Sequence, residues 1–482
     1  MVDLRPVGYV IGLLIAVLGA TMLAPMALDL WLGNDNWLAF VQAAILTALT
    51  GGVLALACSN DLPGGLTVQQ AFLLTTGAWA VLPFFGALPF LLGAPGVELV
   101  DGYFEAMSGL TTTGSTVFEG LDEMPAGVLL WRGILQWLGG LGIVIVAMVF
   151  LPVMRVGGMQ FFRSEGFDTL GKVLPRSKDI SAALIRVYVG LTVLCAVTYF
   201  ALGMTSLEAV VHALTTLSTG GFSTTDLSFG KFAGVAEYAG ALFMVLASVP
   251  FVRLIQMMGG EPMQVLRDVQ VRAYLRWIGY AVLAIVAHRV LIQGHGLEAS
   301  VRETLFNVVS FFSGTGYGSE DVTLWGPFAF VILIAVGAIG GCTASTGCSI
   351  KVFRYLVLIE AIRGQISRLY SPRRVVLLHL EGRPLEADIV DSVIAMFAFF
   401  ILGFGLLSVA LSMTELTTIT AITAAWTAIF NVGPAFGPEV GSTGAMHAFP
   451  DTAKWLMSAG MLVGRLEVVA VLVLFLPRFW RG

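Results

Sequence analysis

One short pattern occurs four times in this chain, at intervals of about a hundred residues. Each occurrence follows a half-length apolar segment, ends on a glycine and precedes an apolar stretch of membrane length. The four occurrences are Thr112-Thr113-Gly114, Ser218-Thr219-Gly220, Gly314-Thr315-Gly316 and Asn431-Val432-Gly433. Their glycines are 106, 96 and 117 residues apart. Repetition at this period predicts one structural unit that is built four times around a shared axis.

The composition places these units in a membrane. Hydrophobic residues make up 57% of the 482 residues and charged residues 12%, against about 45–50% and about 25% in ordinary soluble domains. A helix needs about 20 apolar residues to cross a bilayer. Ten stretches are long enough, at residues 7–31, 37–58, 66–92, 129–153, 181–203, 236–258, 273–293, 325–360, 389–413 and 453–477.

The segments that precede the four loops are too short to span, at residues 97–110, 206–217, 297–312 and 415–430. Two of them begin with the spacing of a capping box, Thr205 with Glu208 and Ser412 with Glu415. Their partly negative C-terminal ends would stabilise a cation at the shared axis. Glycine lets successive carbonyl oxygens face that axis, where they replace the hydration shell of a monovalent cation. Four ordinary glycine kinks are the alternative, but kinks do not explain the polar residues around every glycine.

The sequence therefore predicts an all-α polytopic membrane protein. Four pseudo-symmetric units, each a helix, a pore helix, a loop and a helix, would surround one ion pore behind an N-terminal two-helix hairpin. The expected boundaries are 1–60 for the hairpin and 61–175, 176–265, 266–375 and 376–482 for the units.

The charges orient this arrangement. If the loops open outward, 20 of the 26 basic residues fall on the side that holds both termini, which the positive-inside rule makes cytoplasmic. Acids gather near the other side, where they would form a vestibule that concentrates cations, or would simply solvate the loops. These acids are Glu98, Asp101, Glu105, Glu119, Asp122, Glu123, Asp226, Glu237, Glu298, Glu303, Glu320, Asp321, Glu415, Glu439 and Asp451.

Two features below the third loop are candidates for a gate. The stretch after Gly337 has too much Gly, Ser and Thr for a regular helix, and broken helices in membranes line cavities; close helix packing is the alternative. Arg465 lies in an apolar span, at a cost of about 2.5–3.5 kcal/mol, so it is either a barrier to cations or part of a structural ion pair. The candidate gate residues are Gly340, Gly341, Cys342, Thr343, Ala344, Ser345, Thr346, Gly347 and Arg465.

The sequence does not contain the residue patterns of metal sites or nucleotide-binding loops. The four cysteines and five histidines have no metal-binding spacing, and no Gly-Lys-Ser/Thr phosphate loop is present. The sequence predicts neither an enzyme nor an organic cofactor, and no nucleic-acid partner is expected.

The motifs resemble those of a known family. The resemblance rests on the segments Thr111 to Ser115, Ser218 to Ser223, Gly314 to Gly318, Asn431 to Pro434 and Gly464 to Glu467. They are similar to the potassium uptake superfamily that includes the Trk and Ktr membrane subunits, most closely its TrkH branch, over nearly the whole chain. The resemblance implies that K+ and Rb+ are the transported ions and that a loop at residues 340–348 obstructs the pore. It also implies a homodimer in a bacterial inner membrane, under a cytoplasmic nucleotide-binding ring.

Two expectations follow from the residues at these loops. Tetrameric potassium channels place four threonines at the innermost site, whereas this chain has Thr112, Ser218, Gly314 and Asn431. This difference predicts weaker discrimination between K+ and Na+ than in a symmetric channel. A secondary symporter that couples K+ to H+ or Na+ is the alternative function. It requires ionisable groups at the midplane, and the sequence offers Arg465 and Glu467 alone.

Overall fold

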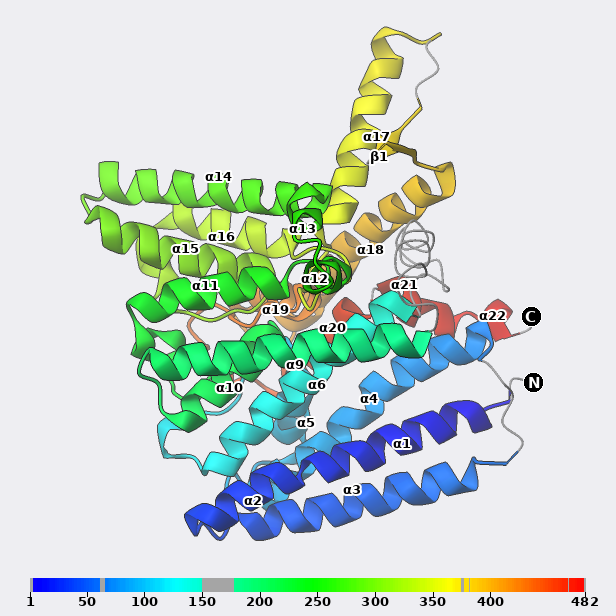
Figure 1. The fold of residues 1–482 in the computed structure, drawn as a ribbon, viewed down its shortest axis with the longest axis vertical. Coiled ribbons are helices and arrows are strands. Elements are labelled where there is room, and N and C mark those ends of the chain that lie inside the picture. Colours follow the sequence, from blue (N-terminus) through cyan, green and yellow to red (C-terminus); the bar gives the residue numbers. More distant parts are fainter. Residues whose placement is uncertain are drawn as a thin grey trace.

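The computed structural model describes residues 3–60, 66–149, 177–373, 377–380, 382–466 and 468–480. Its N-terminal hairpin, in blue at one edge of Figure 1, has α1 and α2 running almost continuously and packed along α3. A Cβ atom on Gly12 or Gly51 would collide with the backbone of the facing helix. The bounds are α1 (Arg5–Thr21), α2 (Leu23–Leu32) and α3 (Trp37–Ala57).

Four units follow in which a long helix, a half-length helix, a loop and another helix recur. The first has α4 (Val68–Leu92), α5 (Leu99–Leu110), η1 (Leu121–Glu123) and α6 (Ala126–Val149). The second has α9 (Ser177–Ala201), α10 (Ser206–Leu217), η2 (Ser228–Phe232), α11 (Val235–Ala247) and α12 (Phe251–Met258). The third has α13 (Met263–Arg267), α14 (Val269–Leu291), α15 (Leu297–Ser313), η3 (Val322–Trp325), α16 (Pro327–Ile339) and α17 (Val352–Tyr370).

The fourth unit begins with a two-stranded antiparallel hairpin. Its elements are β1 (His379–Leu380), β2 (Arg383–Pro384), α18 (Ala387–Ser412), α19 (Thr418–Phe430), α20 (Asp451–Arg465), α21 (Val468–Leu472), η4 (Val473–Phe475) and α22 (Pro477–Trp480). The all-helical fold class is thus confirmed. The start of α1 and the end of α22 lie at the same end of the molecule (Figure 1).

The ten predicted stretches are not all unbroken helices. Among the described residues, seven helices are long and apolar enough to cross a membrane, or eight if α11 and α12 count as one broken span. The stretch 325–360 is interrupted, as its composition predicts. The stretches 236–258 and 453–477 are broken as well, which the sequence analysis did not predict, because α11 and α12 meet at 100° and α20 ends at Arg465. Residues 150–153 of another stretch lie outside the described ranges.

The bend between α11 and α12 has an identifiable cause. Pro250 ends the first helix, and the backbone groups that the bend frees are bound by the interrupted segment of the third unit. Cys342 N donates to Ser248 O at 2.9 Å, and Phe251 N donates to Ala344 O at 3.0 Å. The two helix breaks therefore satisfy each other's backbone hydrogen-bonding groups, which makes both breaks tolerable at membrane depth.

The half-length helices begin and end close to the predicted positions, and their capping differs in one case. Thr205 and Glu208 form the predicted capping box of α10. The predicted box of Ser412 and Glu415 is wrong, because Ser412 still belongs to α18 and Glu415 has a φ of 68°. Instead Glu439 comes to the start of α19, where it accepts hydrogen bonds from Thr417 N at 3.0 Å and Oγ1 at 2.9 Å.

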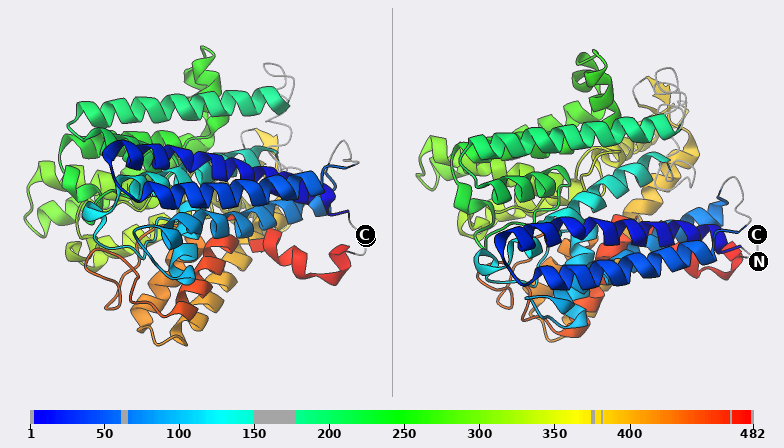
Figure 2. Two further views of the ribbon diagram at one scale, coloured as in Figure 1. Left: turned by 90° about the horizontal axis from the view of Figure 1, so that it is seen from below. Right: turned by 60° about the horizontal axis from the view of Figure 1, so that its bottom comes forward.

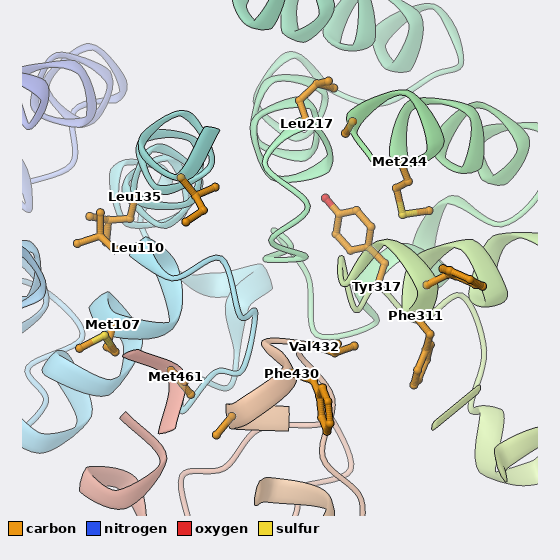
Figure 3. Close-up of a cluster of buried hydrophobic side chains, with 14 of the residues drawn as sticks. Met107, Leu110, Leu135, Leu217, Met244, Phe311, Tyr317, Phe430, Val432 and Met461 are labelled. Carbon is orange, nitrogen blue, oxygen red and sulfur yellow. The ribbon is translucent and has the colours of Figure 1, made fainter. Parts of the chain in front are cut away.

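One hydrophobic core runs through all four units. Figure 3 shows side chains of several units around the loops, among them Leu110, Leu217, Phe311 and Val432. The core thus holds the ends of the half-length helices together. In both views of Figure 2 the N-terminal hairpin, in blue, lies in front of the other helices, at the outside of the bundle.

Candidate ion pathway

The four predicted loops meet in a closed ring. A Cβ atom on Gly114 would collide with the carbonyl oxygen of Gly220, and one on Gly221 with that of Thr315. A Cβ atom on Gly316 would lie 2.8 Å from Gly433 N, and one on Gly433 would lie 3.2 Å from Thr113 O. Each loop therefore touches the next in chain order, and the fourth touches the first.

The backbone conformation is similar in the four loops. The first position of each is left-handed, with a φ of 52° at Thr112, Thr219 and Asn431 and 82° at Gly314. The third position is left-handed in three loops, with a φ of 91° at Gly114, 79° at Gly221 and 78° at Gly316. Left-handed backbone is rare for residues other than glycine, so three such non-glycine positions in one ring indicate a geometry that the surrounding structure imposes.

This geometry corrects the register of the second loop. Its equivalent of Thr112-Thr113-Gly114 is Thr219-Gly220-Gly221, one residue later than the predicted Ser218-Thr219-Gly220. The hydrogen bonds that end the half-length helices agree, because Thr113 N donates to Ser108 O at 2.9 Å and Gly220 N to Thr215 O at 2.9 Å. Two consecutive glycines made the sequence ambiguous here, and Ser218 is the C-terminal cap of α10.

Three of the half-length helices hold their loop with a polar side chain seven residues before the left-handed position. Glu105 accepts a hydrogen bond from Val117 N at 3.0 Å, His212 Nε2 lies 3.0 Å from Ser223 Oγ, and Asn307 Nδ2 donates to Ser319 Oγ at 2.9 Å. In the fourth unit, Thr427 Oγ1 donates to Pro434 O at 2.6 Å instead. The chain beyond each loop is thus fixed to the helix that precedes it.

A buried ion pair joins the first two units at the ring. Arg132 of α6 is 1% exposed and its Nε lies 2.8 Å from the carboxylate of Glu105, which is 0% exposed. The guanidinium also donates to Ser223 O at 2.9 Å and lies 4.1 Å from the ring centre of Phe222. Glu105 was predicted near the outer side, but the sequence did not indicate its pairing with Arg132.

A cavity of about 710 Å³ opens on one side of the ring. The glycines Gly114, Gly221, Gly316 and Gly433 line it together with acidic residues of the following segments. These acids are Asp226, Glu320 and Asp321. The predicted acidic vestibule is therefore smaller than the sequence suggested, because several of the other acids form ion pairs with basic side chains, and Glu320 itself lies 3.5 Å from Arg289 Nη2.

One of those pairings lies outside the spans. Lys231 Nζ lies 3.0 Å from Glu208 and 3.4 Å from Asp122, and its hydrogen bond to Glu208 raises the pKa of Lys231. Burial opposes ionisation of Asp122, but hydrogen bonds from Thr225, Asp226 N and Lys231 lower its pKa overall. These groups fasten the first unit to the second.

The interrupted segment of the third unit, residues 340–351, lies on the other side of the ring. Cys348 Sγ lies 3.6 Å from Thr112 Oγ1, and a Cβ atom on Gly314 would lie 2.9 Å from Cys348 Cβ. Its backbone is bound by its neighbours, since Thr346 N donates to Ala247 O at 3.3 Å and Thr343 N to Gln270 Oε1 at 3.0 Å. The segment is buried against the first positions of two loops.

Arg465 contacts this segment directly. Its Nη1 donates to Cys348 Sγ at 2.7 Å, and its Nη2 lies 3.4 Å from Thr346 O. Arg465 is 5% exposed, and no acid among the described residues pairs with it; Glu467 lies outside those residues. The structure thus brings together the two features that the sequence named as gate candidates.

The four predicted loops therefore form one ring, and the predicted stretch 340–347 lies beside it, in contact with Arg465 through Thr346 O. The sequence did not indicate the role of three residues that hold the ring in place. These residues are Glu105, Arg132 and Gln136, whose side-chain amide lies against Gly220. Polar residues in apolar helices are a signal that could have identified them.

These features define a multi-span membrane transport protein. The chain matches the sequence profile of the family described as TrkH, cation transport protein, over residues 37–481. It is 39% identical to the Trk system potassium uptake protein TrkI of Halomonas elongata, over 99% of this chain and 97% of that protein. It is 32% identical to the Trk system potassium uptake protein TrkH of Escherichia coli, over 99% of both chains.

The fold agrees with these matches. The crystal structure of the potassium transporter TrkH from Vibrio parahaemolyticus superimposes with a TM-score of 0.90, at 30% identity, over 99% of this chain and 100% of that one. The chain belongs to the TrkH family of cation transport proteins, and that family consists of transporters, not enzymes.

Proposed function

We propose that this chain is the potassium-translocating subunit of a Trk-type uptake system, which passes K+ and Rb+ through the ring of loops into the cell. The observation that carries the proposal is the closed contact between the glycines of all four loops. The names of the relatives, which describe potassium uptake proteins, support the choice of ion.

The proposed mechanism uses the backbone of the ring. An ion in the outer cavity, attracted by Asp226, Glu320 and Asp321, exchanges water for carbonyl oxygens as it enters. The ends of the half-length helices add negative potential at the same place. The membrane potential drives entry, because one charge gains about 2.3 kcal/mol per 100 mV.

The gate of the proposed pathway is residues 340–347 with Arg465. Cys348, which directly follows this stretch, contacts Thr112 and Gly314, and these contacts support a block immediately beneath the ring. The guanidinium adds a positive charge at the same point, which repels a cation that has lost its water. Opening would require that Arg465 release two contacts, from Nη1 to Cys348 Sγ and from Nη2 to Thr346 O.

The proposal extends to topology and assembly. The chain would lie in a bacterial inner membrane with both termini in the cytoplasm, and its functional units are the hairpin 1–60 and the four repeats 61–175, 176–265, 266–375 and 376–482. It would form a homodimer and bind a cytoplasmic nucleotide-binding ring. The shared position of the two termini fits this topology.

A symporter that couples K+ to H+ or Na+ is the second candidate. It requires an ionisable group that can bind and release an ion near the ring. Glu105 is such a group by position, but Arg132 already neutralises it at 2.8 Å. Single-channel currents in planar bilayers would favour the pore, and strict coupling of K+ flux to a second ion would favour the symporter.

Flux through purified protein in liposomes tests the proposal, with K+, Rb+, Na+ and Cs+ measured under one imposed potential. We expect K+ and Rb+ to enter faster than Na+. Equal rates for all four ions, or no flux above that of protein-free liposomes, would contradict the proposal. Gly405→Ala is the matched control for glycine variants of the ring, because nothing lies within 4 Å of a Cβ atom at position 405.

A further inference from the structure

The second loop differs from the others at its middle position. The residues there are Thr113, Gly220, Thr315 and Val432, so only the second loop lacks a side chain. In the other loops this side chain anchors the backbone. Thr113 Oγ1 lies 2.7 Å from Thr111 Oγ1, Thr315 Oγ1 lies 2.7 Å from Ser313 Oγ, and Val432 is buried in the core.

Gln136 of α6 takes the place of the missing side chain. A Cβ atom on Gly220 would collide with the side-chain amide of Gln136, so the amide occupies that space. Gln136 Nε2 donates to Gly220 O at 2.7 Å, and Gln136 Oε1 accepts from Phe222 N at 3.0 Å. Gln136 is 0% exposed, so it forms a fixed two-point clamp on the loop.

The clamp also changes one carbonyl of the ring. Gly220 O accepts a strong amide hydrogen bond, whereas the carbonyl oxygens of Thr113, Thr315 and Val432 accept none from any described residue. The positive end of the Gln136 N–H dipole lies against Gly220 O, so it opposes the attraction of that oxygen for a nearby cation. The four middle positions therefore offer a cation three carbonyl oxygens at full strength and one weakened oxygen. This difference matters because selectivity depends on the number and field strength of the coordinating oxygens.

We infer that Gln136 is a positioning and specificity-determining residue of the ion pathway. It replaces the side chain that Gly220 lacks, and it weakens the Gly220 carbonyl as a cation ligand, which lowers the preference for K+ over Na+. The inference rests on the proposed function, because it assumes that the ring carries the ion. It involves no residue of the gate.

Three variants test it, Gly220→Thr, Gln136→Ala and the double variant. Gly220→Thr alone should lose most K+ flux and melt at a lower temperature, because the new side chain collides with Gln136. Gln136→Ala alone should lower the melting temperature by removing the clamp. The double variant gives the second loop the threonine found in the first and third and frees the Gly220 carbonyl. It should regain flux and stability, and its K+ to Na+ flux ratio should rise severalfold above that of the unmodified protein.

Two results would overturn the inference. If the double variant is no more stable than Gly220→Thr, Gln136 does not occupy the side-chain position. If it regains flux with an unchanged K+ to Na+ ratio, the hydrogen bond to Gly220 does not affect specificity. A failure of the proposed function would differ, since the unmodified protein would then carry no K+ while the melting temperatures would still show the mutual rescue.

Discussion

The ring of loops and the segment 340–351 are both irregular backbone at membrane depth, but they use their polar groups in opposite ways. In the ring, most carbonyl oxygens of the three loop positions accept no hydrogen bond from described residues, and the side chains behind them fix the loops. In the segment, backbone groups of Cys342, Thr343, Ala344 and Thr346 are bound to neighbouring helices. Free oxygens suit the binding of a cation, and satisfied groups suit a plug.

The two regions also differ in what holds them. The ring is supported by buried pairs and clamps, such as Arg132 with Glu105. The segment is held to Arg465 by a sulfur atom and one long contact at 3.4 Å. The difference suggests a rigid ring that selects the ion and a segment whose weakest attachment is its contact with Arg465. The following experiments test this contrast, from the largest expected effect to the smallest.

Removal of a support of the ring should cost the most stability. Arg132→Met leaves Glu105 buried without its partner, and breaking a buried pair in this way costs about 3–5 kcal/mol. We expect a clear fall in the melting temperature of the protein in detergent. Arg363→Met is the control, because Arg363 is 72% exposed in its pair with Glu360. Equal stability of the two variants would mean that the ring does not depend on the pair.

A change within the ring should reduce transport more than it reduces stability. Gly221→Ala places a Cβ atom against Thr315 O at a left-handed position. A displacement of about 1 Å in a preorganised site costs about 100-fold in rate, so K+ flux should fall by this order. Gly405→Ala should retain its flux. If Gly221→Ala transports normally, the corrected register of the second loop is wrong.

Weakening the contact between Arg465 and the segment 340–351 should raise K+ flux instead of lowering it. Arg465→Met removes both contacts to the segment and its positive charge, and we expect basal K+ flux to rise about tenfold, equivalent to about 1.4 kcal/mol of barrier. Deletion of residues 345–347 should act in the same direction. The exposed Arg478→Met serves as control. Loss of folded protein with no gain in flux would assign Arg465 a structural role.

The smallest effect concerns the fourth unit. The hydrogen bond from Thr420, with those from Thr417, lowers the pKa of Glu439 below its ordinary value of 4.5. A lowered pKa contributes stability above the pKa of the unfolded chain, and this contribution is lost as the pH falls through the folded value. Glu439→Gln should therefore melt slightly below the unmodified protein at pH 7, and the gap should close in acid. A gap independent of pH would contradict the capping role of the carboxylate.

Much of this architecture is readable from sequence because it depends on local signals. The half-length helices, the interrupted segment near Gly340 and the capping box of Thr205 follow from length, composition and spacing. The predicted box at Ser412 was wrong because α18 runs to that residue, and the acid that caps α19 comes from Glu439, which follows the loop. A local sequence pattern does not show that a residue beyond the loop folds back to cap the helix before it.

The remaining errors arise from contacts between units. Two adjacent glycines, Gly220 and Gly221, left the register open, and only the neighbouring loops determine it. Gln136 looks in sequence like one polar residue in an apolar helix, and its function becomes visible when α6 is seen beside the second loop. The bend at Pro250 likewise depends on the third unit to satisfy its backbone.

The central claim is that four loops jointly bind one dehydrated alkali ion, and anomalous diffraction from crystals grown in Rb+ tests it most directly. We predict Rb+ density on the axis of the ring, within coordination distance of carbonyl oxygens from all four loops. Density elsewhere in the molecule, with none inside the ring of Gly114, Gly221, Gly316 and Gly433, would contradict the claim.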